Sequence, residues 1–300
     1  MTKQDEKAKK ELLGHLKGPN SSRNLAHNLA LGPRIKDVGK EKNKLVTVLT
    51  RTFFVGFLDF PAVNPTKISP AGSAFALDYQ GRQYLITASH VIKFPVRHPG
   101  EKGRIYIWLN NAWNPLEVTV VGRGDANIVE NDVAVLAADI PLPIPIRSSE
   151  ESFEPSIDDI SWGQRVYFCG FPYGNYTKTD VIEGYPMAMI KGAILSGMYT
   201  KSGTLTERER GLFVLDGINN GGFSGGPAVF RSREKRNADF QVFGVVSGYL
   251  TYETKVMCEG KETGDYIEEN TGLIHCPSIM RAVDMIEAKP IGFEISRSIK

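Results

Sequence analysis

The stretch GGFSGGP at residues 221–227 sets one serine, Ser224, between two pairs of glycines and ahead of a proline. Glycine adopts backbone angles that other residues avoid, and it leaves no side chain over neighbouring amides. A serine in such a loop can stand exposed while N–H groups converge on one point, as an oxyanion hole requires. The other interpretation is a glycine-rich surface turn. Because the whole string follows the apolar run LFVLD at residues 212–216, we favour a nucleophile.

A serine hydroxyl is a weak nucleophile and needs a general base. Among the five histidines, His90 differs from the rest because it follows the apolar run QYLITA in the string YLITASHVI, where a strand is expected to end. The others lie in the polar N-terminal region, in a proline-rich loop or in a short apolar run: His15, His27, His98 and His275. A histidine at a strand end is more often structural, so the assignment of His90 depends on its partners.

The base in turn needs a carboxylate that holds its tautomer and stabilises the imidazolium. Asp132 opens the apolar run DVAVLA in the string ENDVAVLAAD, where an acid at the head of a buried strand can meet a histidine. Its alternative role is to cap a turn or a strand. His90, Asp132 and Ser224 follow one another with gaps of 42 and 92 residues. That chain order is the chymotrypsin order, distinct from subtilisin and from α/β-hydrolases, and it predicts a catalytic triad.

Short runs rich in Val, Ile, Phe and Tyr, separated by Gly, Pro, Asn and Asp, predict about a dozen β-strands in two sets. The candidates are 51–59, 73–78, 83–88, 105–109, 116–121 and 133–137, then 165–170, 181–190, 192–199, 212–216, 227–231, 241–249 and 272–275. A proline-rich, then acidic segment at 141–156 predicts an extended linker between the sets. We expect an all-β protein with a basic N-terminal extension (1–44), two halves (45–140 and 157–275), and a C-terminal helix and tail (276–300). Helices are expected at 4–17 and at 278–288, the second capped by Ser278.

Three strings carry a resemblance to a known family: TASH around His90, NDVAVL around Asp132 and GGFSGGP around Ser224 resemble the three signatures of trypsin-like peptidases. GSAFAL (72–77), FCGFPYG (168–174), GAILSG (192–197) and GLIHCPS resemble strings of the bacterial HtrA/Deg-type branch. The similarity covers roughly residues 50–288, and since only twelve residues follow, we expect a protease domain without a PDZ domain. The resemblance implies two packed six-stranded antiparallel β-barrels, with His90 and Asp132 from the first barrel and Ser224 from the second.

The resemblance also implies roles for the residues around the triad. The backbone N–H groups of Gly222 and Ser224 match the oxyanion hole. The string VVSGYL at 245–250 resembles the strand that binds substrate backbone and borders the primary specificity pocket. The string GINNGG at 217–222 matches the opposite wall. The implied substrate-binding residues are Ile218, Asn219, Asn220, Val246, Ser247, Gly248 and Tyr249.

Three departures from the family pattern bear on activation, disulfide bonding and specificity. Phe223 stands where digestive and blood-clotting members carry an acid that pairs with a new N-terminus, so that activation route is not expected. Val91 replaces the cysteine that usually follows the catalytic histidine. GINNGG holds no carboxylate, so we expect cleavage after a small or medium apolar residue of a protein or peptide substrate rather than after Lys or Arg.

Charge is distributed unevenly along the chain. Residues 1–44 hold eleven Lys or Arg and five Asp or Glu, a balance of +6, which leaves −4 for the remainder of a chain with net charge +2. A basic tail on a mildly acidic body does not indicate a nucleic-acid-binding domain. The tail is a candidate contact for a protein regulator, an acidic partner or a membrane surface.

The compartment is predicted from what the sequence lacks and from its cysteines. The sequence contains no run of eighteen apolar residues, so we expect no membrane span. The N-terminus lacks the apolar core of a secretory signal. Three cysteines, Cys169, Cys258 and Cys276, are an odd number, and they favour a reducing, cytoplasmic location. One bridge between Cys258 and Cys276 remains possible.

Two other function classes stay open. The chain can be a catalytically silent relative that binds peptides or serves as a scaffold, or a protease that is inactive until a partner orders the 217–224 loop. It can also be a metal protein, since Cys258, His275 and Cys276 supply ligand types. No CxxC or HxxxH spacing occurs, so we expect no metal and no cofactor.

Overall fold

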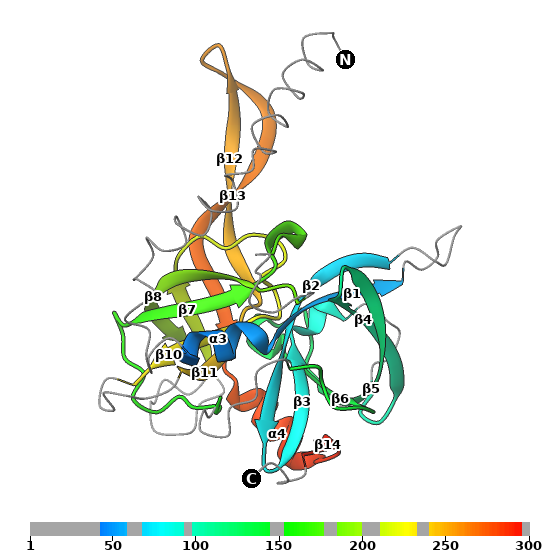
Figure 1. Ribbon diagram of the computed structural model, residues 1–300. Coiled ribbons are helices and arrows are strands. Elements are labelled where there is room, and N and C mark those ends of the chain that lie inside the picture. The colour runs from blue at the N-terminus through cyan, green and yellow to red at the C-terminus, as the bar shows by residue number, and fades with distance from the viewer. Residues whose placement is uncertain are drawn as a thin grey trace, which may run out of the picture. The chain divides into compact units, whose positions relative to one another are not determined.

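The computed structural model describes residues 43–58, 68–92, 98–144, 153–176, 185–199, 211–232 and 240–295. The predicted helix at 4–17, nearly all of the N-terminal extension and part of the 141–156 linker lie outside these ranges. The body of the chain, residues 44–300, forms one compact unit. The all-β class is confirmed: two sheets carry the architecture (Figure 1). No helix in the described part of the chain has the length and apolar character needed to cross a membrane.

The first sheet closes into a six-stranded antiparallel barrel. Its strands run in the order β3-β2-β1-β4-β5-β6, and β3 pairs again with β6 to complete the ring. A seventh strand, β14, adds to the first half of β3, where Phe293 pairs with Gln83. The bounds are β1 Thr52–Leu58, β2 Ile68–Tyr79, β3 Arg82–Thr87, β4 Lys102–Leu109, β5 Ala112–Arg123, β6 Ala134–Ala138 and β14 Phe293–Glu294.

The second sheet has seven strands in the order β11-β10-β7-β8-β9-β13-β12. Its ends approach each other, since a single bridge joins Gly244 on β11 to Ser278 just after β13, and the Ser247 amide donates to the His275 carbonyl (3.0 Å). Six strands therefore curl into a barrel-like second sheet that only this bridge and hydrogen bond bring together, so the second of the two expected barrels is not closed by a strand pairing, and β12 extends beyond it. The bounds are β7 Arg165–Gly170, β8 Met189–Tyr199, β9 Leu212–Asp216, β10 Pro227–Arg231, β11 Phe240–Val245, β12 Gly248–Cys258 and β13 Lys261–Pro277.

Helices are few among the described residues. They are α3 Asn43–Thr50, α4 Met280–Ala288 and the 3-10 turns Ser89–Val91, Val129–Asn131 and Pro172–Gly174. Ser278 lies where the sequence predicts a cap, and its Oγ accepts from the Met280 amide (3.2 Å). Helix α4 buries Ala282, Val283 and Ile286, the period expected of an amphipathic helix on a core.

The two sheets share one buried apolar cluster, which joins the interior of the first barrel to one face of the second sheet, while the opposite face of the second sheet forms its own core. The ring of Phe54 on β1 stacks on Phe171, which follows β7, with centroids 5.3 Å apart. The ring of Phe75 on β2 meets the edge of Phe153 at 6.1 Å. This packing fixes the first barrel against the second and so holds together side chains from distant parts of the chain.

The long hairpin of β12 and β13 leaves this body (Figure 1, orange). Its two-residue turn, Glu259–Gly260, has positive φ at both positions (48° and 76°), as a type I′ hairpin turn requires. The expected strand at 241–249 is in fact two strands, since β11 ends at Val245 and β12 begins at Gly248. The hairpin was not predicted. Both of its faces are exposed, so its sequence does not alternate between apolar and polar residues.

Candidate functional site

The glycines around Ser224 leave no room for a side chain. Gly225 has φ +85°, and a Cβ there would lie 2.0 Å from the Ser73 carbonyl oxygen. At Gly226 a Cβ would lie 1.9 Å from the Cys169 carbonyl oxygen, and at Gly222 (φ +103°) it would lie 2.3 Å from that of Phe171. The GGFSGGP pattern therefore reflects a backbone pressed against both barrels, which fixes where Ser224 stands.

Ser73 on β2 orients the peptide before the serine. Its Oγ donates to the Gly222 carbonyl oxygen (2.7 Å) and accepts from the Phe171 amide (3.1 Å). Its own amide donates to the Ser224 carbonyl oxygen (2.8 Å). In the described part of the chain, the N–H groups of Gly222 and Ser224 donate to no protein acceptor. Both amides of the implied oxyanion hole are thus unengaged. The GSAFAL string drew attention to this strand, but the role of Ser73 was missed.

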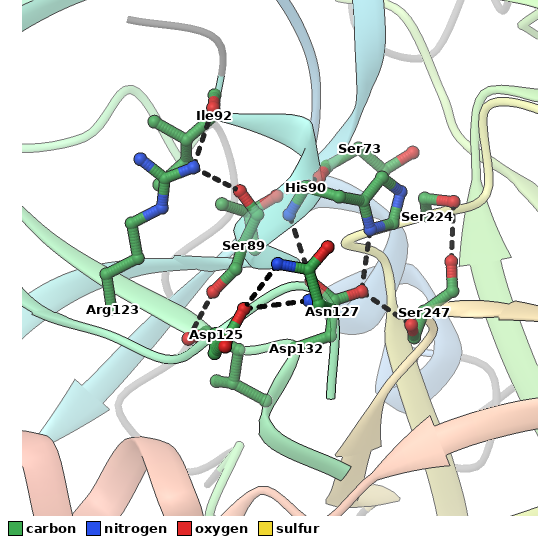
Figure 2. A network of polar contacts seen from close by, with 12 residues as sticks. Ser73, Ser89, His90, Ile92, Arg123, Asp125, Asn127, Asp132, Ser224 and Ser247 are labelled. Carbon is green, nitrogen blue, oxygen red and sulfur yellow. Dashed lines mark hydrogen bonds and ion pairs between the residues drawn. The ribbon is translucent and has the colours of Figure 1, made fainter. Parts of the chain in front are cut away.

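His90 and Asp132 meet at the end of the first barrel (Figure 2). His90 lies in the 3-10 turn that follows β3, and its Nδ1 is 2.6 Å from Asp132 Oδ2. The His90 backbone amide also donates to Asp132 Oδ1 (2.9 Å). The Asp132 side chain is 2 % exposed, whereas that of His90 is 41 % exposed. The Nδ1 edge of the His90 ring is therefore fixed by Asp132, and part of the ring is accessible to solvent.

Asp132 is kept ionised by its partners. Burial raises the pKa of its carboxyl, but the hydrogen bonds from His90 and Ser247 together with the charge of His90 outweigh that effect, and the pKa lies below its usual value. Ser247 Oγ donates to Asp132 Oδ2 (2.5 Å). The sequence placed Ser247 in the substrate-binding strand, and its hydroxyl contact with Asp132 was not foreseen.

Ser224 joins the same network through the backbone of Ser247. Its Oγ donates to the Ser247 carbonyl oxygen (2.7 Å). The three residues predicted as a triad are therefore linked by hydrogen bonds through Ser247, as Figure 2 shows. Among the described residues no hydrogen bond joins Ser224 to His90 directly.

Three further hydrogen bonds fix the turn that carries His90. Ser89 Oγ donates to the Val133 carbonyl oxygen (2.8 Å). The guanidinium of Arg123 donates to the carbonyl oxygens of Ser89 (3.1 Å) and Ile92 (3.0 Å) (Figure 2). Because these contacts hold the turn at both ends, they fix the backbone that carries the His90 ring.

The predicted pocket walls differ in exposure. Ile218 is 66 % exposed and Tyr249 is exposed, whereas Asn219, Val246 and Ser247 are buried, and Asn220 and Gly248 are half-buried. Asn219 Oδ1 accepts from the Asn220 amide (2.8 Å), so this side chain shapes the loop from inside.

Lys191 on β8 holds the 217–222 loop, a role that the sequence did not indicate. Its Nζ donates to the Ile218 carbonyl oxygen (2.9 Å) and to Asn220 Oδ1 (2.5 Å). The same ammonium lies 5.4 Å from the centroid of the Phe223 ring, a cation–π distance. One cation thus contacts three residues within seven positions of the candidate nucleophile.

The residues of the metal alternative lie apart. His275 and Cys276 are consecutive on β13, so their side chains point to opposite faces of the sheet. Cys258 pairs with Lys261 at the far end of the hairpin. Within the described ranges no group of His, Cys, Asp and Glu has the arrangement of a metal site. All three cysteines are free, with Cys258 exposed and the other two buried.

The fold and the site define a class of protein: a closed β-barrel carries a His–Asp pair and a second, barrel-like sheet carries a serine on a glycine-rich loop, as in chymotrypsin-like proteins. The sequence matches the trypsin-like peptidase domain over residues 72–235. The match spans more than half of the 300 residues, and the chain belongs to the trypsin-like peptidase family. The family expected from the three strings is confirmed. A comparison with curated protein sequences returns no match.

A comparison with solved structures returns proteases of low sequence identity. The HtrA-type protease AlgW, solved with a decapeptide, is 17 % identical with a TM-score of 0.49, over 83 % of this chain and 67 % of that one. The Rv3671c protease from M. tuberculosis, in its active form, is 18 % identical with a TM-score of 0.48, over 85 % and 90 %. The MamO protease domain from Magnetospirillum magneticum is 15 % identical with a TM-score of 0.41, over 79 % and 96 %.

Proposed function

We propose that this protein is a serine endopeptidase in which Ser224 is the nucleophile, His90 the general acid and base, and Asp132 the residue that orients His90. The observation that carries the proposal is the buried Asp132 carboxylate, which accepts from the His90 ring, the His90 amide and Ser247 Oγ. A buried charge is stable only when it is paired and hydrogen-bonded. One of these partners, Ser247, also accepts from Ser224 Oγ through its carbonyl oxygen, a link that a cap on a surface turn would not need.

The contact between His90 Nδ1 and Asp132 supports one tautomer of the neutral ring. Since ionised Asp132 accepts from Nδ1–H of His90, Nε2 carries the lone pair and is the atom that can take a proton. Ser224 Oγ must rotate away from the Ser247 carbonyl oxygen toward this Nε2. The rotation exchanges one hydrogen bond for another, so its energetic cost is small.

The reaction then follows in two halves. His90 Nε2 takes the proton as Ser224 Oγ bonds to the scissile carbonyl carbon, and the carbonyl electron pair moves to oxygen. The N–H groups of Gly222 and Ser224, unengaged within the described protein, donate to this oxyanion. When the pair returns, the C–N bond breaks and His90 gives its proton to the leaving amine. Water, deprotonated by His90, releases the acyl group and restores Ser224.

The substrate is a protein or peptide, in keeping with the family. The loop before Ser224 offers the apolar, exposed side chain of Ile218 and the half-buried Asn220, without a carboxylate. Residues 246–249, the link between β11 and β12 with the start of β12, form the facing wall. Both walls support cleavage after a small or medium apolar residue, and dominant cleavage after Arg in a peptide-library profile would contradict this preference.

A fluorophosphonate probe tests the nucleophile, because it reacts with an activated serine and leaves other hydroxyls unmodified. Wild-type protein is expected to take one label, on Ser224, and Ser224→Ala none while its circular dichroism stays unchanged. Ser232→Ala, which removes a buried serine hydroxyl far from Asp132, is the matched control and should label normally. Persistent labelling of Ser224→Ala would identify another nucleophile.

A regulated or silent relative is the second candidate, favoured by the rotamer in which Ser224 bonds to Ser247 rather than to His90. On this alternative a partner of the basic extension 1–44 would switch the site on. Comparing the labelling rate of the full chain with that of a form lacking residues 1–44 separates the two. Equal rates would argue against regulation through the extension. A cytoplasmic location also belongs to the proposal, supported by three free cysteines and testable by cell fractionation.

A further inference from the structure

The β12–β13 hairpin rises directly from the candidate site. β12 begins one residue after Ser247, whose carbonyl oxygen accepts from Ser224 Oγ. At the base of β13, Asn270 Nδ2 donates to the Asn219 carbonyl oxygen (2.9 Å), and the Gly217 amide donates to the Gly272 carbonyl oxygen (2.8 Å). The hairpin is therefore hydrogen-bonded to the 217–222 wall of the predicted pocket and is continuous with the opposite wall.

One edge of β12 is open. β12 is the last strand of its sheet, and within the described residues no strand pairs with its outer edge. The edge begins at Gly248, directly after Ser247, and runs to Cys258, about 33 Å at ~3.3 Å per residue. Open edges bind extended peptides by adding a strand. Exposed apolar side chains along it offer further contact: Tyr249, Leu250, Tyr252 and Met257.

The hairpin also carries a net negative charge as large as that of residues 45–300 taken together. Residues 248–277 hold six Asp or Glu and two Lys, a balance of −4, which equals the balance of the whole of residues 45–300. Glu253 on β12 stands directly opposite Glu268 on β13, and like charges directly opposite destabilise a strand pair. Lys255 is engaged by Glu262 (2.8 Å), and neither Glu253 nor Glu268 has an ion pair in the described structure.

From these observations we propose that the open edge of β12 binds the part of a polypeptide substrate that precedes the scissile bond, and that Glu253 and Glu268 select basic residues there. The inference rests on the proposed peptidase function and extends it to a substrate class. Glu253 lies six residues beyond Ser247, so the favoured Lys or Arg falls about five to seven residues before the cut. Cationic side chains at that place would offset the repulsion between the two carboxylates.

Quenched fluorescent peptides with a common cleavage sequence test the proposal. One peptide carries two Lys at five to seven residues before the cut, a second carries two Glu, and a third lacks this upstream segment. At low salt the Lys peptide is expected to have kcat/KM about three- to tenfold above that of the Glu peptide. The difference should vanish at 1 M salt, where the screening length is about 3 Å. A ratio near one at low salt would overturn the proposal.

Charge-neutral variants assign the effect to the two carboxylates. E253Q/E268Q should bring the Lys-to-Glu ratio close to one and leave cleavage of the short peptide unchanged. E259Q/D265N removes the same charge from the same hairpin, away from that pair, and should keep the wild-type ratio. An equal loss in both double variants would contradict selection at Glu253 and Glu268.

Binding separates this inference from the proposed function. Fluorescence anisotropy with Ser224→Ala measures affinity for the Lys and Glu peptides without any cleavage. Tighter binding of the Lys peptide, lost in Ser224→Ala combined with E253Q/E268Q, supports the hairpin site even if the enzyme fails to cleave. Equal binding of both peptides by a protein that labels at Ser224 would overturn the hairpin site alone.

Discussion

Ser224 Oγ donates its hydrogen bond to the backbone carbonyl oxygen of Ser247, 2.7 Å away, while Ser247 Oγ donates to Asp132. A single residue therefore contacts both the nucleophile and the buried carboxylate. The backbone carbonyl of Ser247 accepts the hydrogen bond of the Ser224 hydroxyl. The Ser247 side chain donates to the Asp132 carboxylate, which orients His90. Removing the side chain leaves the first contact intact and breaks the second.

Ser247→Ala should lower kcat with little change in KM. A hydrogen bond to a charged group contributes about 1.5–3 kcal/mol, and its loss from buried Asp132 weakens the hold on His90, so we expect kcat to fall about tenfold or more. Steady-state kinetics with a peptide substrate measure this. Ser232→Ala is the control for the loss of a buried hydroxyl, and an equal fall in both variants would refute the positioning role.

Asp132 should govern stability in acid. The pKa of its carboxyl is lowered in the folded protein because its hydrogen bonds and the His90 charge outweigh burial, so the carboxylate stabilises the fold fully above its unfolded pKa of about 3.9. This contribution is lost as pH falls through the folded pKa. Urea unfolding between pH 7 and 3 should show a shallower loss below about pH 4 in Asp132→Asn than in wild type.

The control for that comparison is Asp139→Asn, since Asp139 is exposed and meets Lys102 at 3.7 Å. Exposed ion pairs of this kind contribute little to the free energy of unfolding. We therefore expect the stability of Asp139→Asn to vary with pH as that of the wild type does. Parallel curves for Asp132→Asn and wild type would mean that Asp132 adds no net stability in its ionised form.

Gly225→Ala tests the fit of the serine loop. The new Cβ would meet the Ser73 carbonyl oxygen at 2.0 Å and Thr87 Oγ1 at 2.2 Å, at φ +85°. We expect a loss of about 3 kcal/mol or more in the free energy of unfolding, from strain and overpacking together. Gly163→Ala has φ +73° with nothing within 4 Å, so it isolates the backbone part, about 1–2 kcal/mol. Chemical denaturation compares them, and equal losses would exclude the clash.

Lys191→Met should loosen the 217–222 loop, because the replacement keeps an apolar stem and removes the donor to Ile218 and Asn220. We expect fluorophosphonate labelling of Ser224 to slow about five- to tenfold. Lys102→Met removes an equal charge from an exposed ion pair and should label at the wild-type rate. An unchanged rate in Lys191→Met would show that the loop holds its shape without the ammonium.

Thiol titration distinguishes free cysteines from a bridge. Cys258 is exposed, while Cys169 and Cys276 are buried, and burial raises the pKa of both buried thiols. Ellman's reagent should therefore react with one thiol in native protein and with three in denaturant. A bridge between Cys258 and Cys276 would instead give none in the native state and one after denaturation without reductant.

The sequence predicted best where chemistry restricts the residue type. The glycines beside Ser224 could be recognised because no other residue fits their φ and space, and His90 and Asp132 because each ends or opens an apolar run. Barrel strands with a buried face, such as β3 and β6, lie close to their predicted ranges. The domain boundaries drawn at 140 and 157 remain predictions.

What the sequence did not predict has its cause in tertiary contacts. Helix α3 is rich in Val and Thr, which have modest helix propensity, and the hairpin has charged residues on both faces. Ser73 and Lys191 look ordinary in their strings, since their value comes from residues about 150 and about 30 positions away. No local pattern carries that information.

The pairing of β14 with β3 has a consequence for the newly made chain. Gln83, seven residues before His90, finds its partner in Phe293, near the end of the protein. At roughly 5–20 residues per second, a ribosome needs about ten to forty seconds to make the stretch between them. During synthesis the strand that leads to His90 thus has an open edge, and this part of the first barrel is completed only after nearly the whole polypeptide has been translated.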